Sequence, residues 1–297
     1  MSSLGKIDLS KKILLTGTGP RGFVGRNLAE ALDDKYDLYT PTSKELDLRD
    51  YDATGFYIDK AKIEAIIHAS SSAENTLDSD LRMYFNLEKL SRDLDKVICF
   101  GSGAEYDKRY DIAMVSEEDI GKRIPVDGYG FAKYIITTHA RLASNIYVIR
   151  LFGIFGKYED WTYKFISNIC CKAVYNLPLT IRRECKFDYI YIDDLPQVIE
   201  WVLEGKPMYK DYNFVHGVPV KLTELAEMVL CAAGKKLDVI MINPNGCNHE
   251  YTASNKRLIQ EMPSFSPVPL SSAIQKLYRY YYDCKDNISY DILKETK

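Results

Sequence analysis

The sequence has few histidines and no closely paired cysteines. Its four histidines are scattered without an HxxxH spacing, so we expect no zinc site and no other bound metal. Seven cysteines occur, and none of them forms a CxxC pair. This pattern is typical of reduced thiols and favours a cytoplasmic protein over a disulfide-stabilised one.

An excess of one charge and long hydrophobic runs are lacking as well. Lys and Arg total 39 against 42 Asp and Glu, a net charge of −3, so neither nucleic acid nor membrane is expected as a partner. No apolar run approaches the roughly 20 residues that cross a bilayer. The first residues, MSSLGKIDLSKK, lack the apolar core of a signal peptide. These absences predict a cytoplasmic location.

Aliphatic runs alternate with helix-like stretches through the first half of the chain. The runs predict strands at 11–18, 36–40, 65–71, 96–102 and 146–156. The stretches between them predict helices at 24–32, 87–94 and 129–143. Such alternation is typical of βαβ units, so we expect an α/β fold with a Rossmann-type, doubly wound parallel sheet.

After Gly156 the alternation loosens. Short strands are expected at 179–182, 187–192 and 238–242, between helices near 162–174, 194–204, 221–233 and 270–282. We therefore expect a Rossmann domain over residues 1–155 and a smaller C-terminal α/β lobe over 156–297. The chain is expected to return to the first domain around 187–215.

A glycine-rich turn, in LLTGTGPRGFVGRNL, joins the first expected strand to the first helix. Gly19, Gly22 and Gly25 have the spacing GxxGxxG, and Gly17 precedes them by two residues. In dinucleotide-binding folds such glycines permit a tight turn, a close approach to the pyrophosphate and close helix packing. Free N–H groups at the helix N-terminus then bind the phosphates. The turn predicts a site for NAD or NADP, although a plain turn would show the same glycines.

The end of the second expected strand favours NADP over NAD. NAD-binding folds usually carry an acid there, which binds the ribose 2′-hydroxyl. Thr42, Ser43 and Lys44 occupy this position instead, and Arg21 lies in the glycine turn. Hydroxyls and cations suit a 2′-phosphate. A shifted strand end would place Asp37 there, which would favour NAD.

Tyr129 and Lys133 in YGFAK stand on one face of an expected helix. A neighbouring ammonium lowers the pKa of a phenol, which can then exchange a proton with a carbonyl or carbinol oxygen. Ser102 ends the expected strand at 96–102, at the sheet edge where α/β folds bind ligands. An exposed helix pair would show the same YxxxK spacing, but the added serine favours a catalytic site.

Several motifs, in order along nearly the whole chain, resemble one known family. It is the extended short-chain dehydrogenase/reductases, whose NAD-dependent epimerase/dehydratase group acts on nucleotide sugars. TGTGPRGFVG resembles the family's TGxxGFxG, LDLRD its GDLRD, IIHASS its VIHLAA and YGFAK its YxxSK. VIRLFGIFG, FDYIYIDDL and YTASNKRLIQEM resemble VxLRxxNVYGP, RDFIYVDDL and DxSKxxxxLGW.

The resemblance assigns roles to particular residues. It implies that Tyr129 is the catalytic acid/base, that Lys133 lowers its pKa and holds the nicotinamide ribose, and that Ser102 binds the reacting oxygen. Asp47 would meet the adenine amino group, and Asn86 matches the asparagine of the NVxGT helix. Further cofactor contacts are expected from Gly19, Arg21, Gly22, Phe23, Val24, Gly25, Thr42, Ser43, Lys44, Leu48, Ala69, Ser70, Ser71 and Tyr129 itself.

Departures from the family patterns narrow the reaction. Gly103 and Ala104 stand where dehydratases of the family carry an Asp-Glu pair, so 4,6-dehydration is not expected. GDP-fucose synthase-like members carry a cysteine at Ala104 and a histidine near Tyr163 and Lys164, so epimerisation at C3 and C5 is not expected either.

Other departures concern the substrate. Gly153 replaces the asparagine of NVYG, and Phe187 replaces the arginine of RDF, which commonly meets the substrate diphosphate. The substitutes expected at the diphosphate are Lys164, Arg182, Arg183 and Lys186. The alternative is that Arg182 and Arg183 are solvated surface charges.

Together these features imply a reductase that uses NADPH on the C4 keto group of a nucleotide-activated 6-deoxysugar. An NAD-dependent 4-epimerase is one alternative, and a non-catalytic, NADP-sensing protein of the same fold is another. Residues 1–155 would hold the dinucleotide, and 156–297 would bind most of the nucleotide sugar. The family is commonly dimeric, so a homodimer is expected.

Overall fold

The computed structural model describes residues 11–71 and 77–295. The expectation about a signal peptide rests mainly on residues 1–10, which lie outside the described residues. Within the described ranges, each helix is too short or too polar to cross a membrane.

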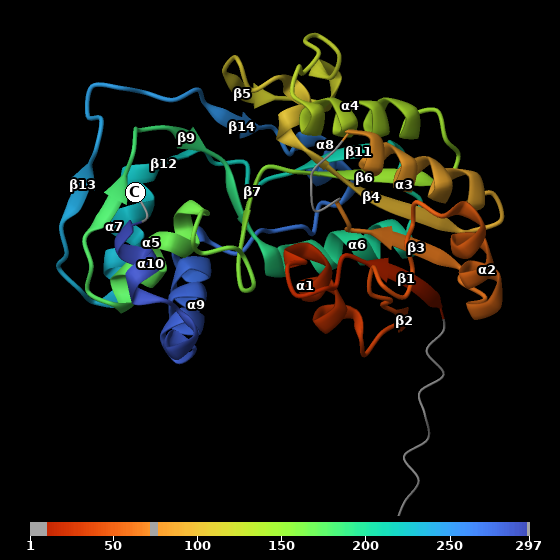
Figure 1. Ribbon diagram of the computed structural model, residues 1–297. Helices are drawn as coiled ribbons and strands as arrows, with labels where there is room; N and C mark the ends of the chain where they lie inside the picture. Colours follow the sequence, from red (N-terminus) through yellow and green to blue (C-terminus); the bar gives the residue numbers. More distant parts are fainter. Residues whose placement is uncertain (1–10, 72–76, 296–297) are drawn as a thin grey trace, which may run out of the picture.

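The main sheet of the described chain is parallel and has six strands in the order β11-β6-β4-β3-β1-β2 (Figure 1). These strands are β1 (Lys12–Thr16), β2 (Asp37–Tyr39), β3 (Ala65–His68), β4 (Lys96–Ser102), β6 (Ile146–Leu151) and β11 (Asp211–Phe214). The expected α/β fold with a parallel sheet is confirmed. Because β2 and β3 flank β1 on opposite sides, the carboxyl ends of β1 and β3 form the topological switch point where such sheets bind ligands.

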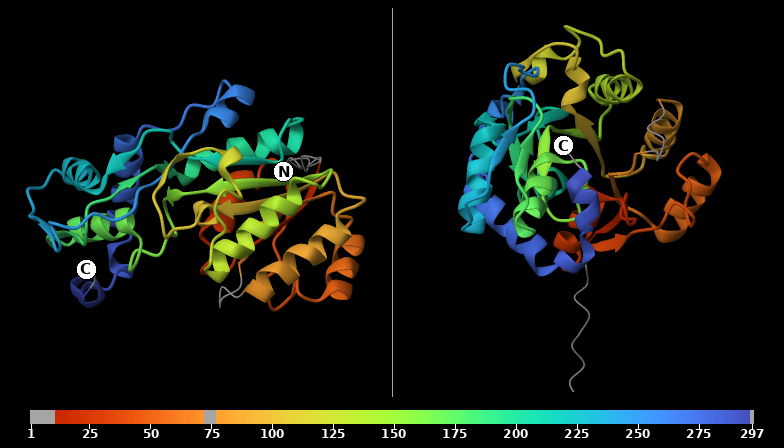
Figure 2. Two further views of the ribbon diagram at one scale, coloured as in Figure 1. Left: turned by 90° about the horizontal axis from the view of Figure 1, so that it is seen from above. Right: turned by 60° about the vertical axis from the view of Figure 1, so that its left-hand side comes forward.

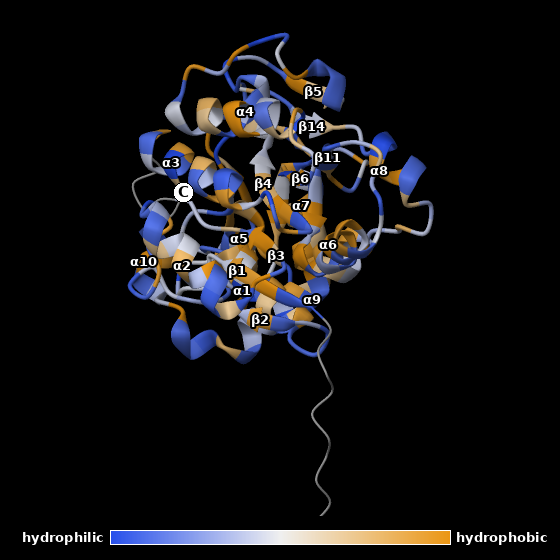
Figure 3. Cartoon of the chain, turned by 90° about the vertical axis from the view of Figure 1, so that its right-hand side faces the viewer, coloured by the Kyte–Doolittle hydropathy of each residue, from blue (hydrophilic) through white to orange (hydrophobic). Residues whose placement is uncertain are grey.

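Helices cover both faces of this sheet. The helices α1 (Phe23–Leu32) and α6 (Leu195–Glu204) contact each other on one face, and Figure 2 shows the other face covered by α2 (Tyr51–Ala61), α3 (Leu77–Leu90) and α4 (Gly128–Ala140). Strand side chains alternate between two hydrophobic cores, with Ile13 and Leu15 in one and Leu14 in the other. Apolar residues accordingly concentrate on the central strands (Figure 3). Burial on both faces explains the unbroken aliphatic runs in the sequence.

The helix expected at 87–94 is wrong in its position. The helix α3 spans Leu77–Leu90 and ends where the Ser91 hydroxyl donates a hydrogen bond to the Glu88 carbonyl at 2.7 Å. Side chains that bond to nearby carbonyls compete with the helical backbone pattern.

The single strand expected at 146–156 is also wrong. The chain leaves the main sheet after β6, and β7 (Gly153–Phe155) pairs instead with β10 (Tyr189–Tyr191). A Cβ at Gly153 would lie 2.6 Å from the Asp188 carbonyl oxygen, so glycine is what allows this close pairing.

The second half of the chain forms a lobe beside the sheet, on the left of Figure 1. The helices α5 (Phe165–Val174), α7 (Leu222–Ala233) and α9 (Leu270–Asp283) pack together, beside β8 (Leu179–Ile181) and β13 (Val239–Met241). The helices α8 (Lys256–Glu261) and α10 (Tyr290–Glu295) lie near the end of the chain. Between these parts the chain returns to the main sheet through α6 and β11.

A small mixed sheet joins the lobe to the first half of the chain. Its order is β12-β9-β14-β5, from β12 (Val220–Lys221), β9 (Lys186–Phe187), β14 (Tyr251–Ala253) and β5 (Ile112–Val115). Since β5 follows β4 in the chain, this sheet brings lobe residues next to the carboxyl end of β4.

Candidate active site

The glycine turn between β1 and α1 is packed against its own backbone. A Cβ at Gly22 would lie 1.7 Å from the Gly17 carbonyl oxygen, and one at Gly25 would lie 2.3 Å from the same atom. Gly17 has a φ of +77°, and Gly19 faces open space. The turn therefore leaves room for a ligand only on its outer side.

The N-terminus of α1 suits the pyrophosphate of a dinucleotide. Its N-cap residue, Gly22, gives no side-chain cap, and its first turn holds no acidic residue. The free N–H groups and the helix dipole are thus available to an anion. Next to this turn, Val24, Ala69, Ser70 and Ser71 line a cavity. The residues present fit NAD or NADP.

Two alanine variants separate tight packing from open space in this turn. We expect Gly22→Ala to destabilise the protein by about 1–3 kcal/mol, because neither its Cβ nor the Gly17 carbonyl can move cheaply. Gly19→Ala should change stability by less than about 0.5 kcal/mol, because nothing lies within 4 Å of its Cβ. Thermal unfolding of both variants checks this, and equal melting temperatures would contradict the described turn.

Residues expected at the adenine ribose lie outside the cavity lining. Thr42 donates from both its backbone N–H and its hydroxyl to the Glu45 carboxylate, at 2.7 and 2.8 Å. Glu45, an exposed acid beyond β2, was not predicted from the sequence. Asp37 begins β2 opposite Lys12, at the end of the strands remote from the glycine turn. The alternative that Asp37 binds the ribose is therefore wrong.

Asp47 and Asn86 are held by protein partners in this structure. Arg49 binds the Asp47 carboxylate, with contacts down to 2.7 Å, and its hydrogen bonds lower the pKa of Asp47. The Asn86 amide donates to the Leu48 carbonyl at 2.9 Å. Asn86 thus fixes the loop that carries Asp47 and Leu48, although neither it nor that loop lines the cavity.

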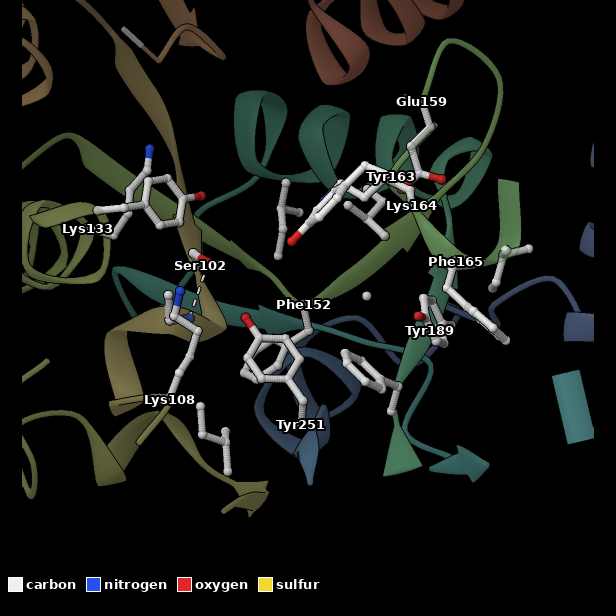
Figure 4. A pocket seen from close by; sticks show the side chains of 18 of the residues that line it. Ser102, Lys108, Lys133, Phe152, Glu159, Tyr163, Lys164, Phe165, Tyr189 and Tyr251 are labelled. Atoms are coloured by element: carbon white, nitrogen blue, oxygen red, sulfur yellow. Dashed lines mark hydrogen bonds between the residues drawn. The ribbon is translucent and has the colours of Figure 1, made fainter. Parts of the chain in front are cut away.

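Ser102, Tyr129 and Lys133 line one cavity of about 1210 Å³. Figure 4 shows Ser102 and Lys133 in its wall. Ser102 is the last residue of β4, while Tyr129 and Lys133 lie one turn apart on α4. Lys133 is buried, and its Nζ lies 5.8 Å from the centre of the Tyr129 ring. A phenol and an ammonium thus face the cavity beside a serine hydroxyl, an arrangement able to bind and protonate a carbonyl oxygen.

Two buried groups near Lys133 carry no charge at neutral pH. Burial, with a smaller contribution from Lys133, lowers the pKa of His68 to about 3. Burial raises the pKa of the Cys99 thiol to about 12. Of His68, Cys99 and Lys133, only Lys133 therefore brings a charge next to Tyr129.

Ser102 is held by its own loop. Its Oγ accepts a hydrogen bond from the Ala104 N–H at 3.2 Å, and its N–H donates to Glu105 Oε1 at 2.8 Å. Arg150, with no exposed surface, binds Glu105 at 2.9 Å and Asp211 at 2.9 Å. This ion cluster, which was not predicted from the sequence, ties the loop after β4 to β6 and β11.

The expected substrate residues divide between the cavity and its surroundings. Ala104, Gly153, Lys164, Arg182 and Arg183 line the cavity. Gly103 is not part of the lining, because the Tyr251 hydroxyl and the Phe152 ring lie against its Cα. Lys186 also lies outside the lining, on β9, where it is exposed.

Aromatic side chains form one wall of the cavity. The Phe187 ring stacks on Tyr189 at a centroid distance of 5.3 Å and contacts Tyr251 at 5.5 Å, which in turn contacts Phe152 at 5.1 Å. Phe187 occupies the position of the arginine in the family's RDF motif. This wall of the cavity is therefore apolar at a position where other members carry a cation for the substrate diphosphate. Tyr163, exposed to 81%, points into the cavity from another side (Figure 4).

Glu159 is a buried acid in the same lining. Ser167 donates a hydrogen bond to its carboxylate at 2.5 Å, and burial raises the pKa of Glu159 from 4.5 to about 7. The native protein therefore holds this proton more tightly than the unfolded chain does between these pH values. The contribution of Glu159 to stability falls as the pH rises from 4.5 to 7 and is level above that.

Replacing Glu159 by Gln should remove this pH dependence. We expect the melting temperature of Glu159→Gln, relative to wild type, to rise as the pH goes from 5 to 8. Glu227→Gln, on the exposed face of α7, is the matched control and should show no such trend. A constant difference between Glu159→Gln and wild type across this range would show that Glu159 is ionised throughout.

A model of the NAD dependent epimerase/dehydratase family matches residues 13–214, more than half of the chain. The chain belongs to this family. Membership confirms the resemblance seen in the motifs, and with it the expectation of NAD or NADP as cofactor. The matched span runs from β1 to the end of β11 and so includes every strand of the main sheet.

Relatives of the family show how far the likeness extends. A GDP-L-colitose synthase from Yersinia pseudotuberculosis is 24% identical over 309 residues, which cover 93% of this chain and 99% of the relative. The structure of a GDP-L-fucose synthetase from Naegleria fowleri bound to NADP has a TM-score of 0.81 at 16% identity, covering 94% and 96% of the two chains. The GDP-mannoheptose C4 reductase of Campylobacter jejuni with NADP bound has a TM-score of 0.77 at 16% identity, covering 92% and 98%. These likenesses confirm the Rossmann-type fold.

Proposed function

We propose that this protein reduces the C4 keto group of a nucleotide-activated sugar with NADPH. The observation that carries the proposal is the convergence of Ser102, Tyr129 and Lys133 on one cavity, next to Ala104. Alanine cannot remove a proton from a sugar carbon, so the site has the groups for reduction and lacks, at this position, one for epimerisation of a neighbouring carbon.

In the proposed mechanism Ser102 donates a hydrogen bond to the sugar carbonyl oxygen, and Tyr129 donates its proton to that oxygen as the alcohol forms. The glycine turn and Lys133 would hold NADPH, which would supply the hydride for C4 of the sugar. The Lys133 ammonium stabilises the resulting phenolate of Tyr129, which regains its proton from solvent. The carbonyl thus gains one hydride on carbon and one proton on oxygen.

Two further assignments concern the ligands. We propose NADP over NAD because Arg21 of the glycine turn and Lys44 after β2 are exposed cations that suit a 2′-phosphate, and because two structurally similar enzymes hold NADP. The substrate diphosphate is assigned to Lys164, Arg182 and Arg183, the cations of the cavity lining farthest along the chain from the glycine turn. The similar enzymes named above act on GDP-sugars, which makes GDP the first nucleotide to test.

Thermal-shift measurements with nucleoside diphosphates in the presence of NADPH test the ligand assignment. A ligand that binds only the native state raises its melting temperature by mass action. We expect GDP to give a larger shift than ADP, CDP, UDP or dTDP, and Arg182→Ala with Arg183→Ala to reduce that shift. No shift with any nucleotide would contradict a nucleotide-sugar substrate.

A homodimer and a cytoplasmic location stay predictions.

A further inference from the structure

Tyr251 brings a second phenol into the candidate active site from the lobe. It lies on β14, whose register places it opposite Phe187 of β9 and Ile112 of β5. Its side chain lines the cavity that holds Ser102, and Figure 4 shows its hydroxyl directed toward that serine. No part of the proposed mechanism uses this hydroxyl.

Gly103 makes room for the Tyr251 hydroxyl. A Cβ at Gly103 would lie 2.4 Å from Tyr251 Oη and 2.6 Å from the Phe152 ring, so any side chain at this position would displace them. The Tyr251 ring packs against Phe187 of the neighbouring strand β9 and against Phe152, which lies between β6 and β7, at centroid distances of 5.5 and 5.1 Å. The phenol is thus held beside the residue that follows Ser102.

The hydrogen bonds of Ser102 leave one acceptor position for this phenol. A serine hydroxyl has one proton to donate and two lone pairs that accept. The Ala104 N–H occupies one lone pair of Ser102 Oγ at 3.2 Å. Burial raises the pKa of Tyr251, an effect partly offset by its interaction with the Ser102 side chain. Tyr251 therefore keeps its proton and can donate it in a hydrogen bond.

We propose that Tyr251 is a positioning residue that donates a hydrogen bond to Ser102 Oγ. Both lone pairs of Ser102 are then occupied, by the Ala104 N–H and by the Tyr251 hydroxyl. The serine proton is left to point at the substrate carbonyl oxygen in the cavity. This inference rests on the proposed function, because it assumes that Ser102 binds the reacting oxygen.

The test removes the Tyr251 hydroxyl and keeps its ring. We expect Tyr251→Phe to lower kcat about tenfold, with little change in KM or in the Kd for NADPH measured by fluorescence. In the Ser102→Ala background, the same substitution should lower kcat no further, because there is no serine hydroxyl left to orient. Tyr134→Phe is the matched control. Tyr134 packs against the same small hydrophobic cluster as Tyr251, but its side chain does not line the cavity.

The possible results separate the inference from the proposed function. An active wild type with an unchanged kcat in Tyr251→Phe would overturn the inference alone. A tenfold fall in kcat when Tyr251→Phe is added to Ser102→Ala would also overturn the inference. The phenol would then have a structural role that does not depend on the serine hydroxyl. A wild type that binds NADPH yet reduces no nucleotide-linked ketosugar would overturn the proposed function, and the inference with it.

Discussion

Tyr129→Phe is expected to lower kcat by about 10²- to 10⁴-fold, the usual contribution of a general acid. The substitution removes the proton donor that faces the cavity and keeps the ring one helical turn from Lys133. Because the aromatic ring is kept and the glycine turn is built from other residues, the Kd for NADPH should stay within about twofold of wild type. Stopped-flow or steady-state NADPH oxidation, with fluorescence titration of NADPH, measures both quantities.

Tyr134→Phe is the control for this prediction as well. It removes a phenol hydroxyl from the same helix, α4, one residue after Lys133 and outside the cavity lining. Its kcat should match wild type. If Tyr129→Phe retained wild-type kcat, another group would have to protonate the sugar oxygen, and the assignment of Tyr129 would be wrong.

Of the substitutions described, Arg150→Met is expected to cause the largest fall in the free energy of unfolding. Arg150 is fully buried, and it binds Glu105 and Asp211, which are exposed by 0% and 2%. These carboxylates and the Tyr106 ring outweigh the effect of burial and hold the pKa of Arg150 above its usual value. Methionine fills much of the volume but leaves Glu105 as a buried charge without its cation, which costs about 3–5 kcal/mol.

We expect this loss to appear as a fall in melting temperature on the order of 10 °C. Arg279→Met is the matched control, because Arg279 pairs with Asp283 on the exposed face of α9. Exposed pairs of this kind contribute about 0–1 kcal/mol, so its melting temperature should barely change. Equal melting temperatures for the two variants would show that the ion cluster does not hold the loop after β4.

Local patterns were sufficient to predict the parts of the site that are formed within one βαβ unit. The strand ending at Ser102 lies where its aliphatic run ends, at 96–102. The glycine turn and the helix that carries Tyr129 and Lys133 likewise follow from short motifs. Each of these depends on residues that are close in sequence, so hydrophobic period and glycine spacing were informative.

Contacts between distant segments could not be predicted in the same way. Tyr251 reaches Ser102 only because β14 pairs with β5 and β9 in a particular register. Arg150 on β6 contacts Glu105 and Asp211 only because β4, β6 and β11 lie side by side in the main sheet. The strand at 211–214 carries Asp211 and Asn213 among its four buried residues, so its hydrophobic signal is weak although it completes the sheet.

Reduction with deuterium-labelled NADPH follows the hydride that the proposed reaction transfers to C4 of the sugar. The protein is incubated with NADPH that carries deuterium at the transferred position and with a GDP-linked 4-keto-6-deoxysugar, and the product is analysed by NMR and mass spectrometry. We expect one NADP formed per sugar reduced and one deuterium at C4 of the product. Unoxidised NADPH together with a sugar that carries no deuterium at C4 would contradict this proposal.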